Sequence, residues 1–160
     1  MNKQEIYQLL DDKGLWYEIT EHGVVYTMED LSHVQLPYPE ADAKNLFVRD
    51  DKKRNYYMIT VTSDKRVDLK EFRNKYGTAK LSFASADDLM AIMGLIPGAV
   101  TPLGLLNDSQ CKVKLFLDRT FDGGLIGVHP NDNTATVWLK TEDLIKLIRE
   151  SGHEVEFVEV

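Results

Sequence analysis

The chain has 160 residues, of which 43% are hydrophobic and 28% are charged, a composition typical of one soluble globular domain. It contains no apolar run near the roughly 18 residues of a membrane span, and its first residues lack the apolar segment of a signal peptide. A net charge of −7 argues against broad nucleic-acid binding, and the single cysteine, Cys111, excludes an internal disulfide. We expect one domain, residues 1–160, in the cytoplasm, with no membrane or DNA partner.

Basic residues are concentrated in the middle third of the chain, whereas acidic residues crowd its two ends. The basic set consists of Lys52, Lys53, Arg54, Lys65, Arg66, Lys70, Arg73, Lys75 and Lys80. Solvated helix faces are the simpler interpretation of this asymmetry, and a local surface for an anionic partner is the alternative.

The first third of the sequence predicts helices around one strand. The predicted elements are a helix capped by Asn2 and running to about Lys13, a strand over 15–20, a helix capped by Thr27 through about His33, and a short helical piece at 40–43. Asn and Thr favour the cap positions because their side chains accept hydrogen bonds from free N–H groups of the first turn.

The middle of the chain predicts a hairpin followed by short helices. The predicted elements are strands over 44–48 and 56–62 joined by a polar loop, a helix over 69–76 between Asp68 and Gly77, a strand over 81–84, and a helix over 86–93 capped by Ser85.

The last third alternates strands and turns before a final helix. The predicted elements are a strand over 111–117 that contains Cys111, paired strands over 125–128 and 134–139, a helix over 141–150 capped by Thr141, and a strand over 155–158. Cys111 is expected to be buried packing rather than a nucleophile. Because several connections are short hairpins, we predict an α/β (α+β) fold with a mixed sheet.

The segment from Gly94 to Asp108 holds three glycines and two prolines among apolar and small residues. A linker would be richer in charge, and Pro97 and Pro102 are incompatible with a helix interior. Gly98 has no Cβ, so its backbone can approach a ligand closely, and the consecutive N–H groups of Gly98, Ala99 and Val100 could converge on an anion or a carbonyl oxygen. A tight apolar connection between a helix and a strand is the equally probable alternative on composition alone.

The sequence lacks the signatures of several common enzyme classes. It has no nucleophile-elbow serine, no phosphate-binding loop, no dinucleotide-binding glycine pattern and no Cys/His set with zinc spacing, so no metal site is predicted. Three polar features remain, namely Lys44, His129 and the backbone around Gly98. Taken singly, Lys44 also fits a solvated lysine and His129 an ordinary turn residue.

Three separated segments, Ala43–Phe47, Pro97–Asp108 and His129–Thr136, together resemble the YbaK/ProX family of trans-acting aminoacyl-tRNA deacylases. This family is homologous to the editing domain inserted in bacterial prolyl-tRNA synthetase. The resemblance spans nearly the whole chain and is most like the freestanding prolyl-tRNA editing subgroup, which removes alanine from proline tRNA. It implies a mixed, strongly curved, barrel-like sheet surrounded by helices, and an activity that needs no cofactor.

The resemblance also implies roles for individual residues. Backbone N–H groups of Gly98 and Ala99 would hold the ester carbonyl, Lys44 would fix a phosphate or polar group at the end of the tRNA, and Asn45 would orient Lys44 or the ribose. His129 would limit the size of the amino-acid pocket, while the substrate's own ribose hydroxyl helps to activate water.

The remaining expected contacts concern the pocket and the tRNA. Further substrate-binding candidates are Val25, Met28, Leu31, Val100, Thr101 and Pro102, with core packing as the alternative for the apolar ones. Lys80 and Arg73 are the candidates for tRNA phosphates. The expected partners are the acceptor end of proline tRNA and prolyl-tRNA synthetase.

Two segments, the turn after His22 and the Gly98 loop, depart from the family pattern. Gly23 follows His22 where proline is common, and Ala99 and Gly104 stand where serine and alanine are frequent. Neither change removes a side chain that the chemistry requires. The alternatives are editing of serine or cysteine, a binding module without turnover on the same fold, and a structural or small-molecule-binding α/β protein.

Overall fold

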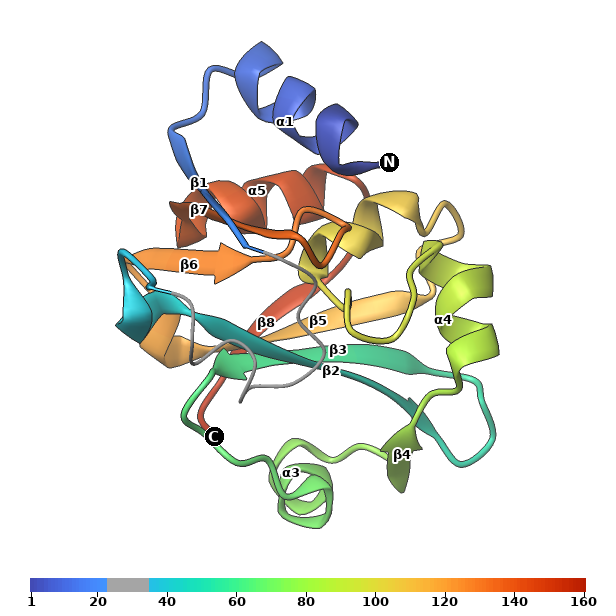
Figure 1. Ribbon diagram of the computed structural model, residues 1–160. Helices are drawn as coiled ribbons and strands as arrows, with labels where there is room; N and C mark the ends of the chain where they lie inside the picture. Colours follow the sequence, from blue (N-terminus) through green and yellow to red (C-terminus); the bar gives the residue numbers. More distant parts are fainter. Residues whose placement is uncertain (23–34) are drawn as a thin grey trace.

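A computed structural model describes residues 1–22 and 35–160 of the chain (Figure 1). The helix predicted from Thr27 to His33, and the pocket candidates Val25, Met28 and Leu31, lie outside the described residues.

The smaller of two sheets joins the start of the chain to its last third. It has the order β1-β7-β6, with β1 at Tyr17–Glu21, β7 at Ala135–Lys140 and β6 at Leu125–Val128. Both pairings are antiparallel, and the predicted pairing of β6 with β7 is confirmed. The turn between these two strands carries His129.

The larger sheet is mixed, as predicted. Its order is β4-β2-β3-β5-β8, with β4 at Leu81–Phe83, β2 at Ala43–Asp50, β3 at Tyr56–Thr62, β5 at Val113–Asp118 and β8 at Val155–Val158. The β2–β3 hairpin and the β2–β4 pair are antiparallel, whereas β3–β5 and β5–β8 are parallel. Parallel neighbours need long crossovers, which here carry the helices.

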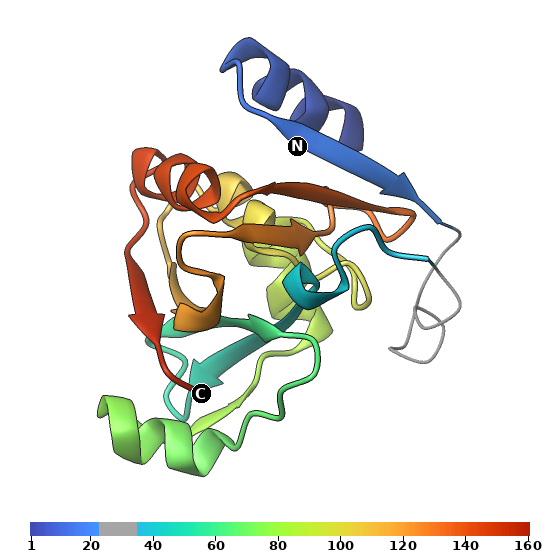
Figure 2. The ribbon, with the colours of Figure 1, turned by 90° about the vertical axis from the view of Figure 1, so that its left-hand side faces the viewer.

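The expected barrel-like closure is not confirmed. The described strands form two sheets, joined by a parallel bridge between Asp42 and Gly127 rather than by a continuous ladder. Figure 2 shows the smaller sheet stacked over one face of the larger one.

Residues 1–22 and 35–160 contain four α-helices, and three of them begin at the caps that the sequence predicts. They are α1 at Lys3–Asp12, α3 at Leu69–Tyr76, α4 at Ala86–Met93 and α5 at Thr141–Glu150. Asn2, Asp68 and Ser85 accept hydrogen bonds from backbone N–H groups of the first turns of α1, α3 and α4, which confirms their predicted roles as caps. The described part of the chain also has three 3₁₀ helices, namely η1 at Pro39–Ala41, η2 at Pro102–Asn107 and η3 at Arg119–Phe121.

Two details of the sequence prediction were wrong. Thr141 is not the cap of α5, because Lys140 keeps extended backbone and Thr141 is already the first helical residue. Cys111 is exposed in the loop before β5, where its backbone has a positive φ of 51° that a strand does not allow.

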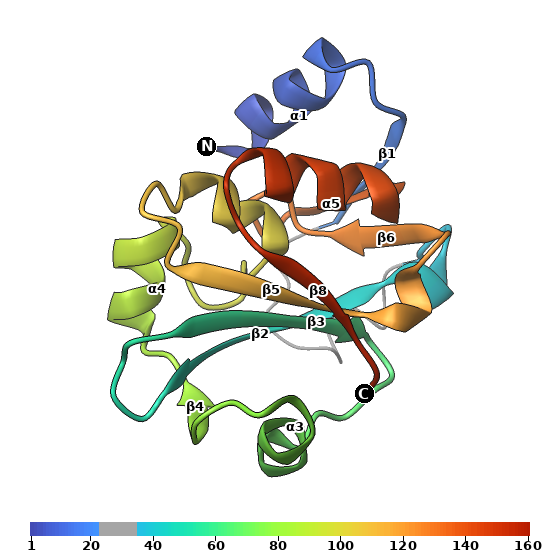
Figure 3. The same ribbon diagram turned by 180° about the vertical axis from the view of Figure 1, so that it is seen from behind.

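Two hydrophobic clusters hold the layers together. One lies between the larger sheet and the elements above it, and it buries Met58, Leu115, Leu139 and Ile148 completely. The other lies under the opposite face, where α3 packs through Phe72 (Figures 1 and 3). Alternate residues of the central strands therefore face different clusters, and both faces of this sheet are covered. No helix in the described ranges is long and apolar enough to cross a membrane.

Asp42 lies where the two sheets meet and is 5% exposed. Burial raises its pKa to about 6 from 3.8, against hydrogen bonds from the Ser63 side chain and the Ala43 backbone. Between these two values the folded chain binds the proton and the unfolded chain does not, so the free energy of unfolding falls as pH rises through this window. Ionisation of Asp42 therefore destabilises the fold at neutral pH.

We expect Asp42→Asn to raise the free energy of unfolding at about pH 7 by on the order of 2 kcal/mol, and to leave it unchanged near pH 4. Urea unfolding across this range measures the difference. Asp51→Asn, in the exposed β2–β3 loop, is the matched control. An equal pH dependence in wild type and Asp42→Asn would contradict the assignment.

Candidate active site

The Gly98 loop connects α4 to η2 through a tight turn. The helix ends at Gly94, whose φ is 66°, and the turn follows at residues 96–99. Ala99 N–H donates to the Ile96 carbonyl oxygen over 3.1 Å, and Gly98 has a φ of 95°. Proline at the second position and glycine with positive φ at the third are the signature of a type II turn.

The prolines act partly as predicted. Pro97 lies beyond the end of α4, but Pro102 occupies the first turn of η2, so the exclusion of helix from the whole segment was wrong. Proline is tolerated there because the first N–H groups of a helix have no internal acceptor. Pro102 itself is buried.

A hydrogen bond within the turn already uses one of the three N–H groups that were predicted to contact the substrate. Ala99 N–H is bonded within the turn, whereas no hydrogen bond is recorded for the N–H of Gly98 or Val100 in residues 1–22 and 35–160. Gly98 and Val100 are also partly exposed, while Ala99 is buried. The donors available to a ligand are therefore the first and third of the trio.

Contacts with the larger sheet and with the turn after β6 hold this loop in place. Asn45 Nδ2 on β2 donates to the Val100 carbonyl oxygen over 3.3 Å, and Thr60 Oγ1 on β3 donates to Asn45 Oδ1 over 2.6 Å. Thr101 Oγ1 donates to the His129 carbonyl oxygen over 2.7 Å. Asn45, the Gly98 loop and the His129 turn thus form one connected cluster.

His129 is held in one tautomer. Its Nδ1 lies 2.9 Å from the Ala135 carbonyl oxygen, which can only accept, so Nδ1 carries the proton. Burial holds the pKa of His129 below its ordinary value, partly opposed by the Ala135 hydrogen bond. The ring is therefore neutral at neutral pH, and Nε2 is an acceptor.

A second histidine borders His129. The His22 and His129 rings are 6.0 Å apart at an interplanar angle of 68°, and His22 Nε2 lies 3.1 Å from Thr136 Oγ1 on β7. The charge that His22 can carry further disfavours protonation of His129.

Lys44 lies on the other face of β2 from Asn45. Its Nζ donates to the Lys65 carbonyl oxygen, in the segment that leads from β3 to α3. Lys65 Nζ in turn lies 2.7 Å from Asp118 Oδ2. Burial alone would raise the pKa of Asp118, but Lys65 and the N–H of Thr120 bring it below the usual value. The structure joins Asn45, and not Lys44, to the Gly98 loop.

The two candidates for tRNA phosphates also lie apart from this loop. Arg73 is exposed on α3, and Lys80 is exposed in the segment that leads to β4. Both belong to the layer under the larger sheet, on the side that Lys44 faces. Among the described residues no group of three or more His, Cys, Asp and Glu is arranged to hold a metal ion.

Comparison with known proteins assigns the chain to a family. The family model described as the aminoacyl-tRNA editing domain matches residues 22–147. The chain belongs to the aminoacyl-tRNA editing domain family. It is 39% identical to the prolyl-tRNA editing protein ProX of Acetoanaerobium sticklandii, over 99% of this chain and 97% of that protein. This confirms the resemblance found in the sequence.

Two further relatives fit this assignment. Prolyl-tRNA synthetase associated domain-containing protein 1 of Mus musculus is 33% identical over 95% of this chain and 92% of that protein. A solved structure of a proposed trans-editing enzyme for prolyl-tRNA synthetase superposes with a TM-score of 0.70 at 16% identity, and covers 99% of this chain and 96% of that one. At that identity the superposition shows the fold alone.

The sequence-based search for site residues in this editing domain missed Thr60 and Thr136. Thr60 is fully buried, lies opposite Asn45 in the β2–β3 register and fixes the Asn45 amide. A signal was present, because counting back from the hairpin loop places these two polar residues opposite each other in the register. Thr136, which contacts His22, belongs to a pairing between distant segments that no local pattern reveals.

Thr101→Val tests the link between the Gly98 loop and the His129 turn. Thr101 is fully buried, and valine keeps its shape but removes both the donor to the His129 carbonyl oxygen and the acceptor of the Leu103 N–H at the start of η2. We expect the free energy of unfolding to fall by about 1–2 kcal/mol, measured by urea denaturation. Thr78→Val is the control, because the Thr78 hydroxyl bonds only the carbonyl of the next residue. Equal losses in both variants would show that the link contributes nothing specific.

Proposed function

We propose that the chain is a trans-editing hydrolase that deacylates mischarged aminoacyl-tRNA, with alanine on proline tRNA as its substrate. One observation supports this most directly. In a chain of the editing family, the Gly98 turn leaves two N–H groups unbonded and is tied to Asn45 on β2 and to His129 in the turn after β6. The names of the relatives point to proline tRNA.

The reaction is attack of water on the ester that joins the amino acid to the terminal ribose. A bond forms between the water oxygen and the carbonyl carbon, the carbonyl oxygen becomes an oxyanion, and the bond to the ribose oxygen then breaks. In this proposal Gly98 N–H and Val100 N–H donate to the oxyanion, where preorganised donors are most effective. The free ribose hydroxyl assists the water, and the departing ribose oxygen takes up the proton.

Selection against proline is proposed to rest on pocket size. A synthetase pocket built for proline cannot strongly exclude the smaller alanine, because the loss of a few methylene groups changes binding by only about 1–3 kcal/mol. A smaller editing pocket rejects proline instead. We assign its wall to the ring of His129, with Asn45, Thr101 and Pro102 supporting it from the loop side.

Residues outside the described part of the chain are proposed to complete the lining of the amino-acid pocket. Val25, Met28 and Leu31 keep their proposed place in its lining, and Ala99 its proposed place in the loop that binds the ester. The unit of function is proposed to be the single domain of residues 1–160, acting in the cytoplasm.

Lys44 has a proposed role in holding the tRNA rather than the ester. Its ammonium lies on the α3 side of the larger sheet, the side to which Arg73 and Lys80 also belong. Phosphates of the acceptor end are the proposed ligands of these three cations. Prolyl-tRNA synthetase is the proposed protein partner, because the tRNA leaves it mischarged.

The test is release of amino acid from proline tRNA charged with alanine, serine, cysteine or proline. Rapid loss of alanine alone supports the assignment. Lys44→Ala is expected to raise KM for the tRNA at least as much as it lowers kcat, because its contact is with phosphate. Preferential release of serine or cysteine would show that a different mischarged tRNA is the substrate. Binding of aminoacylated tRNA without hydrolysis of any of the four would show that the chain is a binding module and not an enzyme.

A further inference from the structure

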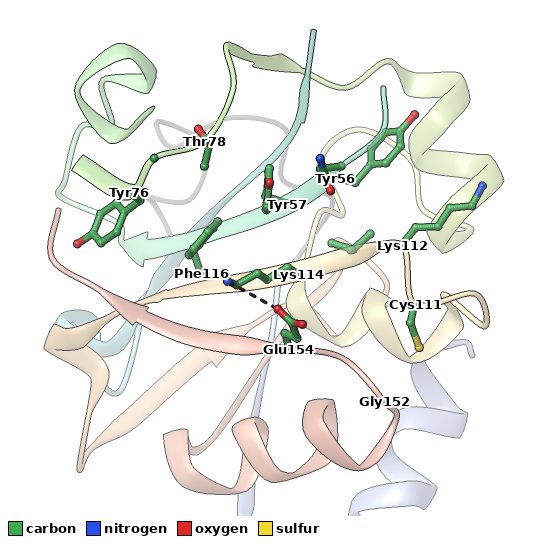
Figure 4. A pocket seen from close by; sticks show the side chains of 13 residues that line it. Tyr56, Tyr57, Tyr76, Thr78, Cys111, Lys112, Lys114, Phe116, Gly152 and Glu154 are labelled. Carbon is green, nitrogen blue, oxygen red and sulfur yellow. Dashed lines mark ion pairs between the residues drawn. The ribbon is translucent and has the colours of Figure 1, made fainter. Parts of the chain in front are cut away.

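One pocket lies away from the Gly98 loop, on the α3 face of the larger sheet (Figure 4). It encloses about 410 Å³, which is within the roughly 300–1,000 Å³ of small-ligand sites. Its residues come from the start of β3, the start of β5, the end of α3 and the turn between α5 and β8. Nothing in the proposed deacylation uses this pocket.

Aromatic rings form the floor of this pocket. The Tyr57 and Phe116 rings lie 5.2 Å apart, and the Tyr76 ring lies 6.2 Å from Phe116. Tyr76 is fixed at its hydroxyl, which donates to the Glu159 carbonyl oxygen over 3.1 Å and accepts from Glu159 N–H over 2.6 Å. Phe116 is buried, whereas Tyr57 and Tyr76 are partly exposed, so their rings are the surfaces that a planar ligand can reach.

Cations border the aromatic floor. Lys114 Nζ lies 4.8 Å from the centre of the Phe116 ring, but it is neutralised by ion pairs with Glu156 at 3.2 Å and with Glu154, which also lines the pocket, at 3.7 Å (Figure 4). Lys112 is exposed and has no ion pair within the described residues. On the far side the pocket reaches Asn55, which directly follows three basic residues, 52–54, of the hairpin loop. Lys112 is thus the lining cation left for an anionic group, and the hairpin cations lie next to the pocket's edge at Asn55.

We propose that this pocket binds one unpaired nucleotide of an RNA strand. The base stacks on Tyr57 and Tyr76, and the adjoining phosphates meet Lys112 and the hairpin cations. Aromatic platforms beside basic side chains bind single strands with little sequence preference, because every base has a face that can stack. The proposal rests on the proposed function in one respect only, which is that the RNA is tRNA.

The pocket and the deacylation site do not share a surface. Tyr57 and Thr60 lie on the same strand but point to opposite faces of the sheet, because they are an odd number of residues apart. The pocket would therefore add affinity for the body of the RNA without contacting the ester.

Cys111 supplies a built-in reporter, since it is the only cysteine, is exposed and lines the pocket. The probe is an RNA hairpin that has a single-stranded 3′ CCA end and carries no amino acid. We expect saturating RNA to slow alkylation of Cys111 by iodoacetamide about fivefold or more. Direct binding is then measured by fluorescence anisotropy at several salt concentrations.

Lys112→Ala should weaken binding and reduce the slope of log Kd against log salt by about 0.7, the value for one phosphate contact on a single strand. Tyr57→Leu keeps an apolar side chain, removes the stacking ring and should weaken binding about tenfold. Lys146→Ala, an exposed lysine on α5, is the matched control and should change neither quantity. Equal thermal midpoints establish that the variants are folded.

Unchanged Cys111 alkylation in the presence of bound RNA would overturn the proposal, as would wild-type affinity in both pocket variants. Equal protection of Cys111 by a polyglutamate peptide would also overturn it, because such a peptide carries charge without bases. Because the probe RNA carries no amino acid, its binding does not depend on ester hydrolysis. Protection without deacylation contradicts only the proposed function, and deacylation without protection contradicts only the pocket.

Discussion

Replacing Gly98 with alanine is expected to lower kcat/KM for deacylation by about 100-fold or more, the effect of removing one oxyanion donor. The backbone φ of Gly98 is 95°, where a Cβ meets the neighbouring carbonyl oxygen, so alanine is strained by about 1–2 kcal/mol. We expect the turn to relieve this strain by rotating, which would move the proposed oxyanion donors, the N–H groups of Gly98 and Val100, off the ester. The loss should appear in kcat, because the donors act on charge that develops in the transition state.

Gly14→Ala is the matched control for this experiment. Gly14 also has a positive φ, 66°, and a Cβ there would meet nothing within 4 Å, so the strain is similar but lies at the end of α1. Both variants should lose stability in urea by similar amounts, and only Gly98→Ala should lose activity. If the two variants deacylate the substrate with the same kcat, the turn does not supply the oxyanion donors.

The largest effect on stability is expected for Gly127→Ala. Gly127 on β6 lies opposite Trp138 on β7, and a Cβ at Gly127 would stand 2.3 Å from the nearest atom of the indole ring. Trp138 is fully buried and its Nε1 donates to Thr20 Oγ1 over 2.9 Å, so the ring cannot move without breaking this bond. We expect the free energy of unfolding to fall by about 3 kcal/mol.

Urea denaturation followed by tryptophan fluorescence measures this loss directly. The control is Gly124→Ala, where the nearest atom to the added Cβ is the Phe121 carbonyl oxygen at 3.7 Å, an ordinary contact. A similar small effect in both variants would mean that Trp138 has room to shift. A large loss in Gly127→Ala alone confirms that the absence of a side chain at Gly127 allows this sheet to pack.

The elements of this fold were largely predictable because their signals are local. Asn2, Asp68 and Ser85 cap the helices that follow them, and the hairpin loop after Asp50 separates two strands that do pair. Thr141 misled the prediction because a strand runs directly into α5, so the extended-to-helical change occurs one residue earlier than a threonine cap would place it. Cys111 misled the prediction because the apolar alternation of β5 begins before Val113, the first residue of the strand.

The site was predictable only in part, for the same physical reason. Asn45, Val100, Thr101 and His129 lie together, but the hydrogen bonds that join them link β2, the Gly98 loop and the turn after β6, and they follow from no local pattern. Lys44 shows the limit most clearly. Neighbours in a strand point to opposite faces, so the sequence proximity of Lys44 to Asn45 places their side chains apart. Similarly, the type II turn that commits Ala99 N–H is a matter of backbone angles rather than of residue type alone.

The parallel pairing of β3 with β5 also has a consequence for how the chain acquires its activity. The β2–β3 hairpin closes over five residues and can form in about 1–10 μs, whereas β5 joins β3 only after a loop of 50 residues has closed. Asn45 and Thr60 therefore meet early, and the Gly98 loop and His129 reach them late. Catalytic competence should be among the last properties to return during refolding, after most of the secondary structure has formed.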